Sequence, residues 1–132
     1  MNTGKVKYVV YPFYLGRPEV ALATEAAWCA ADQDHFFAYQ HALYENFEMT
    51  LSEQNLVELA SELELDMSQF EPCLSNRTHR NDVEAARQAA MRQGVNSTPT
   101  FFVNGQKLEG NQPYSAFQTV IDRYIQQAQN TP

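Results

Sequence analysis

The sequence predicts an α/β protein in which helices pack on a small mixed sheet. A β-branched and aromatic run at residues 5–11 has the composition of a strand. A long helical stretch follows over residues 18–93, and a β-hairpin over residues 100–109 leads into a last helix over residues 114–129. Because helices and strands each bury an apolar face against another element, this order favours one layered core. The length of 132 residues suits one domain, which is expected over residues 1–132.

The composition excludes several function classes. The net charge of −7 repels a phosphate backbone and no basic stripe offsets it, so no nucleic-acid partner is expected. No run of about 18 apolar residues exists, so no membrane span is expected. The first residues contain no apolar run of the signal-peptide type.

The predicted strand and helices follow from local patterns. Residues 5–11 read Lys-Val-Lys-Tyr-Val-Val-Tyr, which alternates and then becomes apolar, as in a strand buried on both faces near its end. Pro18 suits the first position of a helix, and an alanine-rich stretch follows it. From His35 onward, aromatic residues recur at helical spacing. Pro72 removes one backbone hydrogen bond, so a break or kink is expected there.

The C-terminal third changes to strand character. Gly94 ends the helical stretch. Thr100-Phe-Phe-Val is apolar and β-prone, and Asn104-Gly105 is the strongest short signal for a hairpin turn. Residues 106–109 then return as the partner strand, and Pro113 opens the last amphipathic helix.

No metal site is expected from the cysteine and histidine spacing. Cys29 and Cys73 are separated by 44 positions and form no local motif. His35, His41 and His79 lack the spacing that pre-arranges zinc ligands. The two cysteines can be buried free thiols, a structural disulfide, or a redox pair; neither has an activating Lys, Arg or His beside it in the sequence.

One segment resembles a known family. Residues 94–105 read Gly-Val-Asn-Ser-Thr-Pro-Thr-Phe-Phe-Val-Asn-Gly. This resembles the cis-proline segment of DsbA-like thioredoxin domains, which are protein-disulfide oxidoreductases. The resemblance extends over most of the chain: residues 3–10 look like the strand after the active-site helix, and the Phe70-Glu-Pro-Cys-Leu segment looks like part of the helical insertion. It implies a truncated thioredoxin-like fold, with the helical insertion between the first strand and the cis-proline hairpin.

The sequence departs from this family at its chemical centre. In the family, a strand and a helix bearing Cys-x-x-Cys precede the Gly4-Lys-Val strand, and no Cys-x-x-Cys occurs in this chain. No catalytic residue and no cofactor are therefore expected. Three explanations are open: a fragment of a longer oxidoreductase, which is favoured, a natural truncation that keeps only peptide binding, or a missing strand supplied by another chain.

The resemblance assigns roles to Thr98, Pro99 and the cysteines. It implies a cis bond before Pro99 and gives the backbone of Thr98 the pairing with an extended peptide or protein thiol substrate. The alternative is that Thr98 only caps a tight turn. Some DsbA-like proteins carry a second, non-catalytic bridge in the helical insertion, which favours a structural disulfide between Cys29 and Cys73.

The missing family strand is central in the sheet, between residues 5–11 and the hairpin. Its absence leaves strand edges without partners, and exposed edges seek other strands. The chain is therefore expected to self-associate through the open sheet, or to close its two strands on each other.

Three functions are consistent with the sequence. The first is a DsbA-family thiol–disulfide oxidoreductase domain that is inactive in dithiol exchange as given. The second is a non-catalytic thioredoxin-like module that binds peptides or partners. The third is a relative of glutathione-dependent transferases or isomerases. The family implies a bacterial source and an extracytoplasmic location, although the chain shows no export signal.

Overall fold

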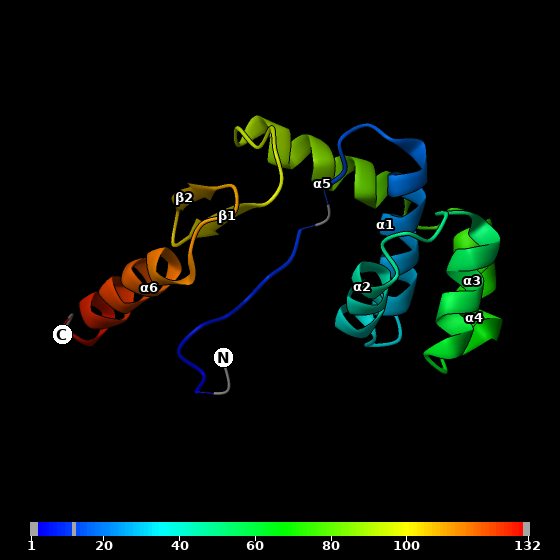
Figure 1. Cartoon of the computed structure of the whole chain (residues 1–132), viewed down its shortest axis with the longest axis horizontal. Helices are drawn as coiled ribbons and strands as arrows, with labels where there is room; N and C mark the ends of the chain where they lie inside the picture. The colour runs from blue at the N-terminus through cyan, green and yellow to red at the C-terminus, as the bar shows by residue number, and fades with distance from the viewer. Residues whose placement is uncertain (1–2, 12, 131–132) are drawn as a thin grey trace. The chain divides into compact units, whose positions relative to one another are not determined.

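The chain forms two compact units in the computed structural model, which describes residues 3–11 and 13–130. One unit combines Met1–Tyr11 with Met91–Pro132, and the other is Pro12–Ala90. Among the described residues there are six helices and a two-stranded antiparallel sheet, so the fold is mixed α/β and mostly helical, as predicted (Figure 1). The prediction of a single domain stays a prediction, because two compact units can belong to one folding domain.

Four helices build the core of the Pro12–Ala90 unit, and α1 contacts the other three (Figure 1). Pro18 begins α1, where its missing N–H costs no helical hydrogen bond. Ala23, Ala26 and Ala30 on α1 are buried, and their small side chains allow close approach of the neighbouring helices. The four helices are α1 (Pro18–Ala31), α2 (Phe36–Glu45), α3 (Glu53–Glu62) and α4 (Met67–Ser75).

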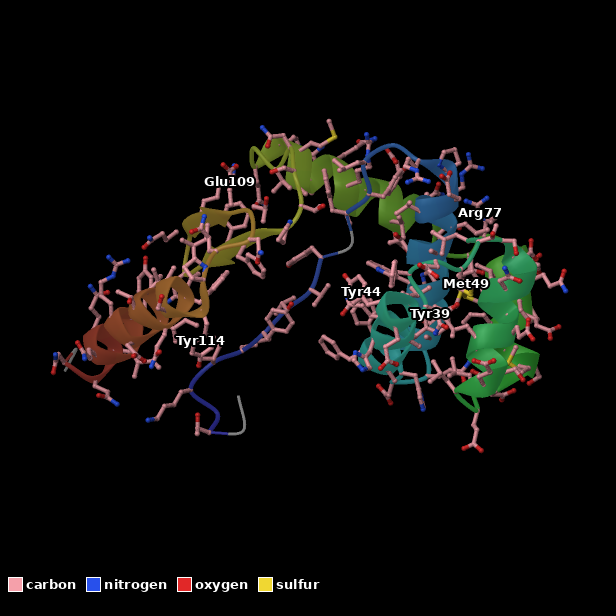
Figure 2. The ribbon with its side chains drawn as sticks, in the orientation of Figure 1. Tyr39, Tyr44, Met49, Arg77, Glu109 and Tyr114 are labelled. Atoms are coloured by element: carbon pink, nitrogen blue, oxygen red, sulfur yellow. A yellow bond between two sulfur atoms is a disulfide. The ribbon has the colours of Figure 1, made fainter. Side chains whose placement is uncertain are left out.

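Large side chains from α2, α3 and α4 fill this core. Tyr39, Leu56, Phe70 and Leu74 are fully buried, and the rings of Tyr39 and Phe70 lie 5.6 Å apart. Tyr44, also on α2, lies on the outer side of the helix and is exposed (Figure 2). The aromatic face predicted for this helix is therefore only partly buried.

Replacing Tyr39 by phenylalanine should destabilise the Pro12–Ala90 unit, called the helical unit below, by about 1 kcal/mol. The reason is that the phenol donates a buried hydrogen bond to Leu56 O at 2.8 Å. Burial raises the pKa of Tyr39 above its ordinary value of 10.0. At a pH below the pKa that Tyr39 has in the unfolded chain, the neutral phenol contributes fully to the free energy of unfolding. At higher pH the phenol ionises in the unfolded chain first, which stabilises the unfolded chain, so this contribution is lost. Urea unfolding of both proteins should show the difference at neutral pH and its decline above pH of about 10. A difference that does not change with pH would contradict the assignment.

The break predicted at Pro72 is not found, because α4 continues through this residue to Ser75. Asp66 caps the start of the helix by accepting a hydrogen bond from Ser68 N at 2.9 Å. Pro72 lacks only its own N–H, while its carbonyl still accepts from Asn76 N at 3.0 Å. The burial of neighbouring helix residues therefore outweighs one missing hydrogen bond.

The segment before α1 is attached to α5 (Arg80–Arg92). Tyr14 donates a hydrogen bond of 2.5 Å to Glu84, and Arg87 donates from Nε to the Tyr14 carbonyl at 3.1 Å. The Arg87 guanidinium also lies over the Tyr14 ring, 5.0 Å from its centre. The hydrogen bond to Glu84 raises the pKa of Tyr14, so the phenol remains a donor at neutral pH.

The hairpin and the last helix form the described C-terminal part of the other unit. Strand β1 (Thr100–Val103) pairs with β2 (Gln106–Glu109), and Val103 faces Gln106 next to the turn. Asn104 and Gly105 have φ angles of 46° and 87°, as a two-residue type I′ turn requires. Helix α6 (Tyr114–Gln129) covers the hairpin through Phe117, whose ring meets that of Phe101 at 4.8 Å.

The strand predicted at residues 5–11 is not formed. The predicted mixed sheet is therefore wrong, because the observed sheet is antiparallel and lacks this strand. The sheet of the described residues contains only β1 and β2. Tyr8, Val9 and Tyr11 are at least half exposed. β-branched composition alone does not make a strand, because strand geometry is stabilised by hydrogen bonds to a neighbouring strand. Self-association through open strand edges stays a prediction.

Candidate functional sites

The Thr98–Pro99 turn is an exposed feature directly before β1. The peptide bond between these residues is cis, and both residues are exposed. The Pro99 carbonyl accepts a hydrogen bond from Gly110 N at 2.9 Å, which continues the β1–β2 pairing by one step. Thr100 Oγ1 donates to the Ser97 carbonyl at 2.7 Å and closes the other side of the turn.

A second contact ties this turn to the end of α5. Lys107 on β2 donates from Nζ to the Gly94 carbonyl at 2.7 Å. Gly94 has a φ of 78°, a conformation that favours glycine and that ends the helix. The start of the loop is therefore tied to the strand that pairs with β1, so that the turn is supported from both ends.

The register of the hairpin decides where the backbone groups of β1 point. Across an antiparallel pair, residues alternate between hydrogen-bonded and non-hydrogen-bonded positions. In a hairpin with a two-residue turn, the pair that flanks the turn, here Val103 and Gln106, is a hydrogen-bonded pair. Every second residue back along β1 has the same orientation, so Phe101 is also hydrogen-bonded to β2 and the Pro99 carbonyl accepts from Gly110 N. The N–H and C=O groups of Thr100 and Phe102 therefore point to the outer edge of β1, and no strand pairs with that edge in the described part of the chain.

The second candidate site surrounds a disulfide in the helical unit. Cys29 on α1 and Cys73 on α4 are bonded, with their Cα atoms 5.9 Å apart. Cys29 is 1% exposed, whereas Cys73 is half-buried. A surface cavity of about 360 Å³ opens beside the sulfur atoms, and its lining includes both cysteines and Asp32. The bridge can therefore be reached from solvent on the Cys73 side.

A histidine and two carboxylates lie beside this bridge. A nitrogen of His79, in the turn between α4 and α5, lies within 4.8 Å of both sulfur atoms. His79 Nε2 is 2.7 Å from Asp32 Oδ2, and Nδ1 is 3.3 Å from Asp82. The Asp32 carboxylate also reaches to 3.9 Å from Cys73 Sγ. The ring of Trp28 packs on the imidazole at 5.6 Å between centres.

The surroundings of His79 favour its charged form. Burial lowers the pKa of His79, but hydrogen bonds to Asp32 and Asp82, together with their charges, outweigh burial and raise the pKa above its ordinary value. A protonated imidazole beside a sulfur pair stabilises a thiolate and can supply a proton to it.

This cluster is not predicted by the sequence. No activating neighbour was expected beside either cysteine, and the structure corrects this prediction by placing His79 there. The residues come from α1, α4 and the α4–α5 turn, so no local spacing reveals them. The available signal was weak: Asp32 follows Cys29 by one helical turn and therefore shares its face.

The chain matches the thioredoxin family over residues 1–123. No solved structure matches the chain significantly.

Among the curated relatives are Na⁺/H⁺ antiporters. The chain is 35% identical over 98 residues to the Na⁺/H⁺ antiporter NhaA 3 of Salinispora tropica, which covers 74% of this chain and 15% of that protein. It is 32% identical over 108 residues to the Na⁺/H⁺ antiporter NhaA of Herminiimonas arsenicoxydans, with 80% of this chain and 17% of that protein covered. The chain thus spans about a sixth of these relatives. Among the described residues, no helix has the length and apolar character needed to cross a bilayer.

Proposed function

Because the chain belongs to the thioredoxin family, we propose that it is a DsbA-like domain that binds an extended peptide segment along β1 and the Thr98–Pro99 turn. The observation that carries this proposal is the outer edge of β1, where the backbone groups of Thr100 and Phe102 point outward beside the exposed turn. An extended peptide adds to such an edge by main-chain hydrogen bonds, and this mode tolerates many side chains.

The proposed activity is binding without Cys-x-x-Cys exchange. Such exchange needs a thiolate at the first turn of a helix and a resolving cysteine three residues later, and the sequence contains no such pair. Cys29 and Cys73 belong to the helical unit, whereas Pro99 belongs to the other unit. We therefore expect background rates for this chain in an insulin-reduction assay, and turnover at the level of an active oxidoreductase would contradict the proposal.

Amide hydrogen exchange tests the binding mode directly. An unfolded, cysteine-free peptide added to the unmodified chain should slow exchange at the amides of Thr100 and Phe102, because these two point to the outer edge. The amides of Phe101 and Val103 should change little, because their partners on β2 already protect them. Equal protection of all four amides, or of none, would overturn the proposed geometry.

A matched pair of variants separates backbone recognition from side-chain recognition. Phe102→Ala keeps the outward N–H and should retain peptide binding, whereas Phe102→Pro removes this donor and should weaken binding by up to about tenfold, the equivalent of one hydrogen bond. The ring contact between Phe101 and Phe117 serves as the folding control, because its chemical shifts report an intact hairpin in both variants. Protection that rises with protein concentration in the absence of peptide would instead indicate self-association through the same edge.

The similarity to antiporters supports a second candidate. Three antiporters are 31–35% identical to this chain over 74–80% of its length. In each of them the matched segment is a small part of a larger protein. We infer that this thioredoxin-fold domain can serve as a module of an Na⁺/H⁺ antiporter. Replacing the matching segment of the Salinispora tropica antiporter by this chain should preserve Na⁺/H⁺ exchange in inside-out vesicles, whereas deleting the segment should reduce it. Full exchange after deletion would exclude a role of the module in transport.

A further inference from the structure

We propose that the Cys29–Cys73 bridge, once reduced, becomes a zinc site with His79 as its third ligand. The inference rests on one observation: ligand atoms of these three residues lie within 4.8 Å of one another although they come from three separate segments. Thiolate sulfur and imidazole nitrogen are the ligands that Zn²⁺ prefers.

The distances require only a small rearrangement. With Zn–S bonds of about 2.3 Å and Zn–N bonds of about 2.0 Å, ligand atoms of a tetrahedral site lie roughly 3.5 Å apart. The imidazole nitrogen has to approach the sulfurs by no more than about 1.3 Å, and the two sulfurs have to separate once their bond is broken. Cys73 is the half-buried partner and lies beside the solvent cavity, so it has the room to move.

The residues around the histidine complete the site. Asp32 Oδ2 lies 3.9 Å from Cys73 Sγ, so a carboxylate stands at the edge of the proposed site. Asp32 lies 2.7 Å from Nε2 of His79 and Asp82 lies 3.3 Å from Nδ1, so whichever ring nitrogen binds the metal, a carboxylate can hold the other one, as in natural metal sites. Trp28 packs against the ring and limits its rotation. The cavity beside Cys29 and Cys73 provides an entry path.

Conversion of the disulfide into the zinc site requires one dithiol as reductant and one Zn²⁺ ion. A dithiol transfers two electrons and two protons to the disulfide, which yields the thiols of Cys29 and Cys73 and leaves the reductant as its own disulfide. Zn²⁺ then replaces the two thiol protons, which are released to solvent. Because a sulfur atom in a disulfide is not a thiolate, the oxidised chain has no such site. The bridge and the metal are thus alternative cross-links between α1 and α4.

Cobalt provides the spectroscopic test. The full chain is reduced with a dithiol, freed of reductant without oxygen, and titrated with Co²⁺ and then with Zn²⁺. We expect one Co²⁺ per chain, with a thiolate-to-cobalt charge-transfer band and the visible bands of tetrahedral cobalt, and complete displacement by Zn²⁺. The oxidised chain should show neither band. A reduced chain without these bands, or an oxidised chain that binds equally well, would overturn the proposal.

Two variants identify the third ligand. His79→Ala should weaken Zn²⁺ binding by the reduced chain at least about 100-fold, because metal sites lose about that much even when a supporting residue is removed. His41→Ala is the matched control, since His41 is exposed on α2 and pairs only with Glu45 among the contacts of the described residues; its Zn²⁺ affinity should equal that of the parent chain. Equal affinity of both variants would also overturn the proposal. His79→Ala retains both cysteines, and the thermal unfolding of its oxidised form shows whether it folds.

Discussion

Reduction of the Cys29–Cys73 bond, with a chelator present to exclude metals, is expected to lower the free energy of unfolding of the helical unit by about 4 kcal/mol. The bond closes a loop with a sequence separation of 44 residues, and in the chain-entropy model a loop of this size restricts the unfolded chain by about that amount. This is a large fraction of the stability of an ordinary domain. The measurement is urea unfolding followed by circular dichroism, with and without reductant.

A variant without the bridge serves as the control for this prediction. The double change of Cys29→Ala and Cys73→Ser should unfold at a lower urea concentration than the oxidised parent, and reductant should not shift it further. Cys29 lies on α1 and Cys73 on α4, and these helices also share a core that includes buried Phe70 and Leu74, so the reduced unit can retain its helices. Unfolding midpoints that are identical before and after reduction would show that the bridge does not restrict the unfolded chain.

Replacement of Arg77 by alanine is expected to destabilise the same unit by about 3 kcal/mol. Glu25 on α1 is 2% exposed, and its carboxylate accepts two hydrogen bonds from Arg77, of 2.5 Å from Nε and 2.7 Å from Nη2. These hydrogen bonds raise the pKa of Arg77, against the effect of burial, so Arg77 keeps its positive charge at every ordinary pH. Removing the cation leaves a buried carboxylate without its partner, which costs about 3–5 kcal/mol. The lower value applies because the Arg77 side chain is 40% exposed and water can partly replace it.

Two comparisons separate this ion pair from other effects of the substitution. Arg77 has a φ of 54°, which alanine tolerates no better than arginine, so the backbone contribution of the change is small. Arg17→Ala is the matched control, because the Arg17–Glu19 pair is exposed on both sides and should contribute nothing measurable. The double variant of Glu25→Leu with Arg77→Ala should be more stable than Arg77→Ala alone, since it removes the unpaired charge. Chemical denaturation of these three variants and the parent measures the difference, and a double variant that is less stable than Arg77→Ala would contradict the assignment.

The hairpin and the last helix could be predicted from the sequence because their signals are local. Asn104 and Gly105 adopt positive φ angles that few other pairs tolerate, and this sets the turn and the register of β1 and β2. The range predicted for the last helix, residues 114–129, coincides with α6, since apolar residues at helical spacing begin after Pro113 and continue to its end.

The predictions failed where the structure depends on partners from elsewhere in the chain. Residues 5–11 have strand composition, but no ladder includes them in the part of the chain that the structure describes. Pro72 was expected to interrupt a helix, yet the contacts of α4 with α1 and α3 keep the helix continuous. In both cases tertiary contacts outweighed the local preference.

The sequence by itself determined the hairpin, the last helix and the absence of a Cys-x-x-Cys pair, because turn residues, helical spacing and cysteine spacing act over a few positions. Only the tertiary structure decided that Cys29 meets Cys73, that His79 and Asp32 lie beside their bridge, and that Arg77 neutralises buried Glu25. These contacts join residues more than 40 positions apart. They depend on how α1 and α4 pack, which no local pattern specifies.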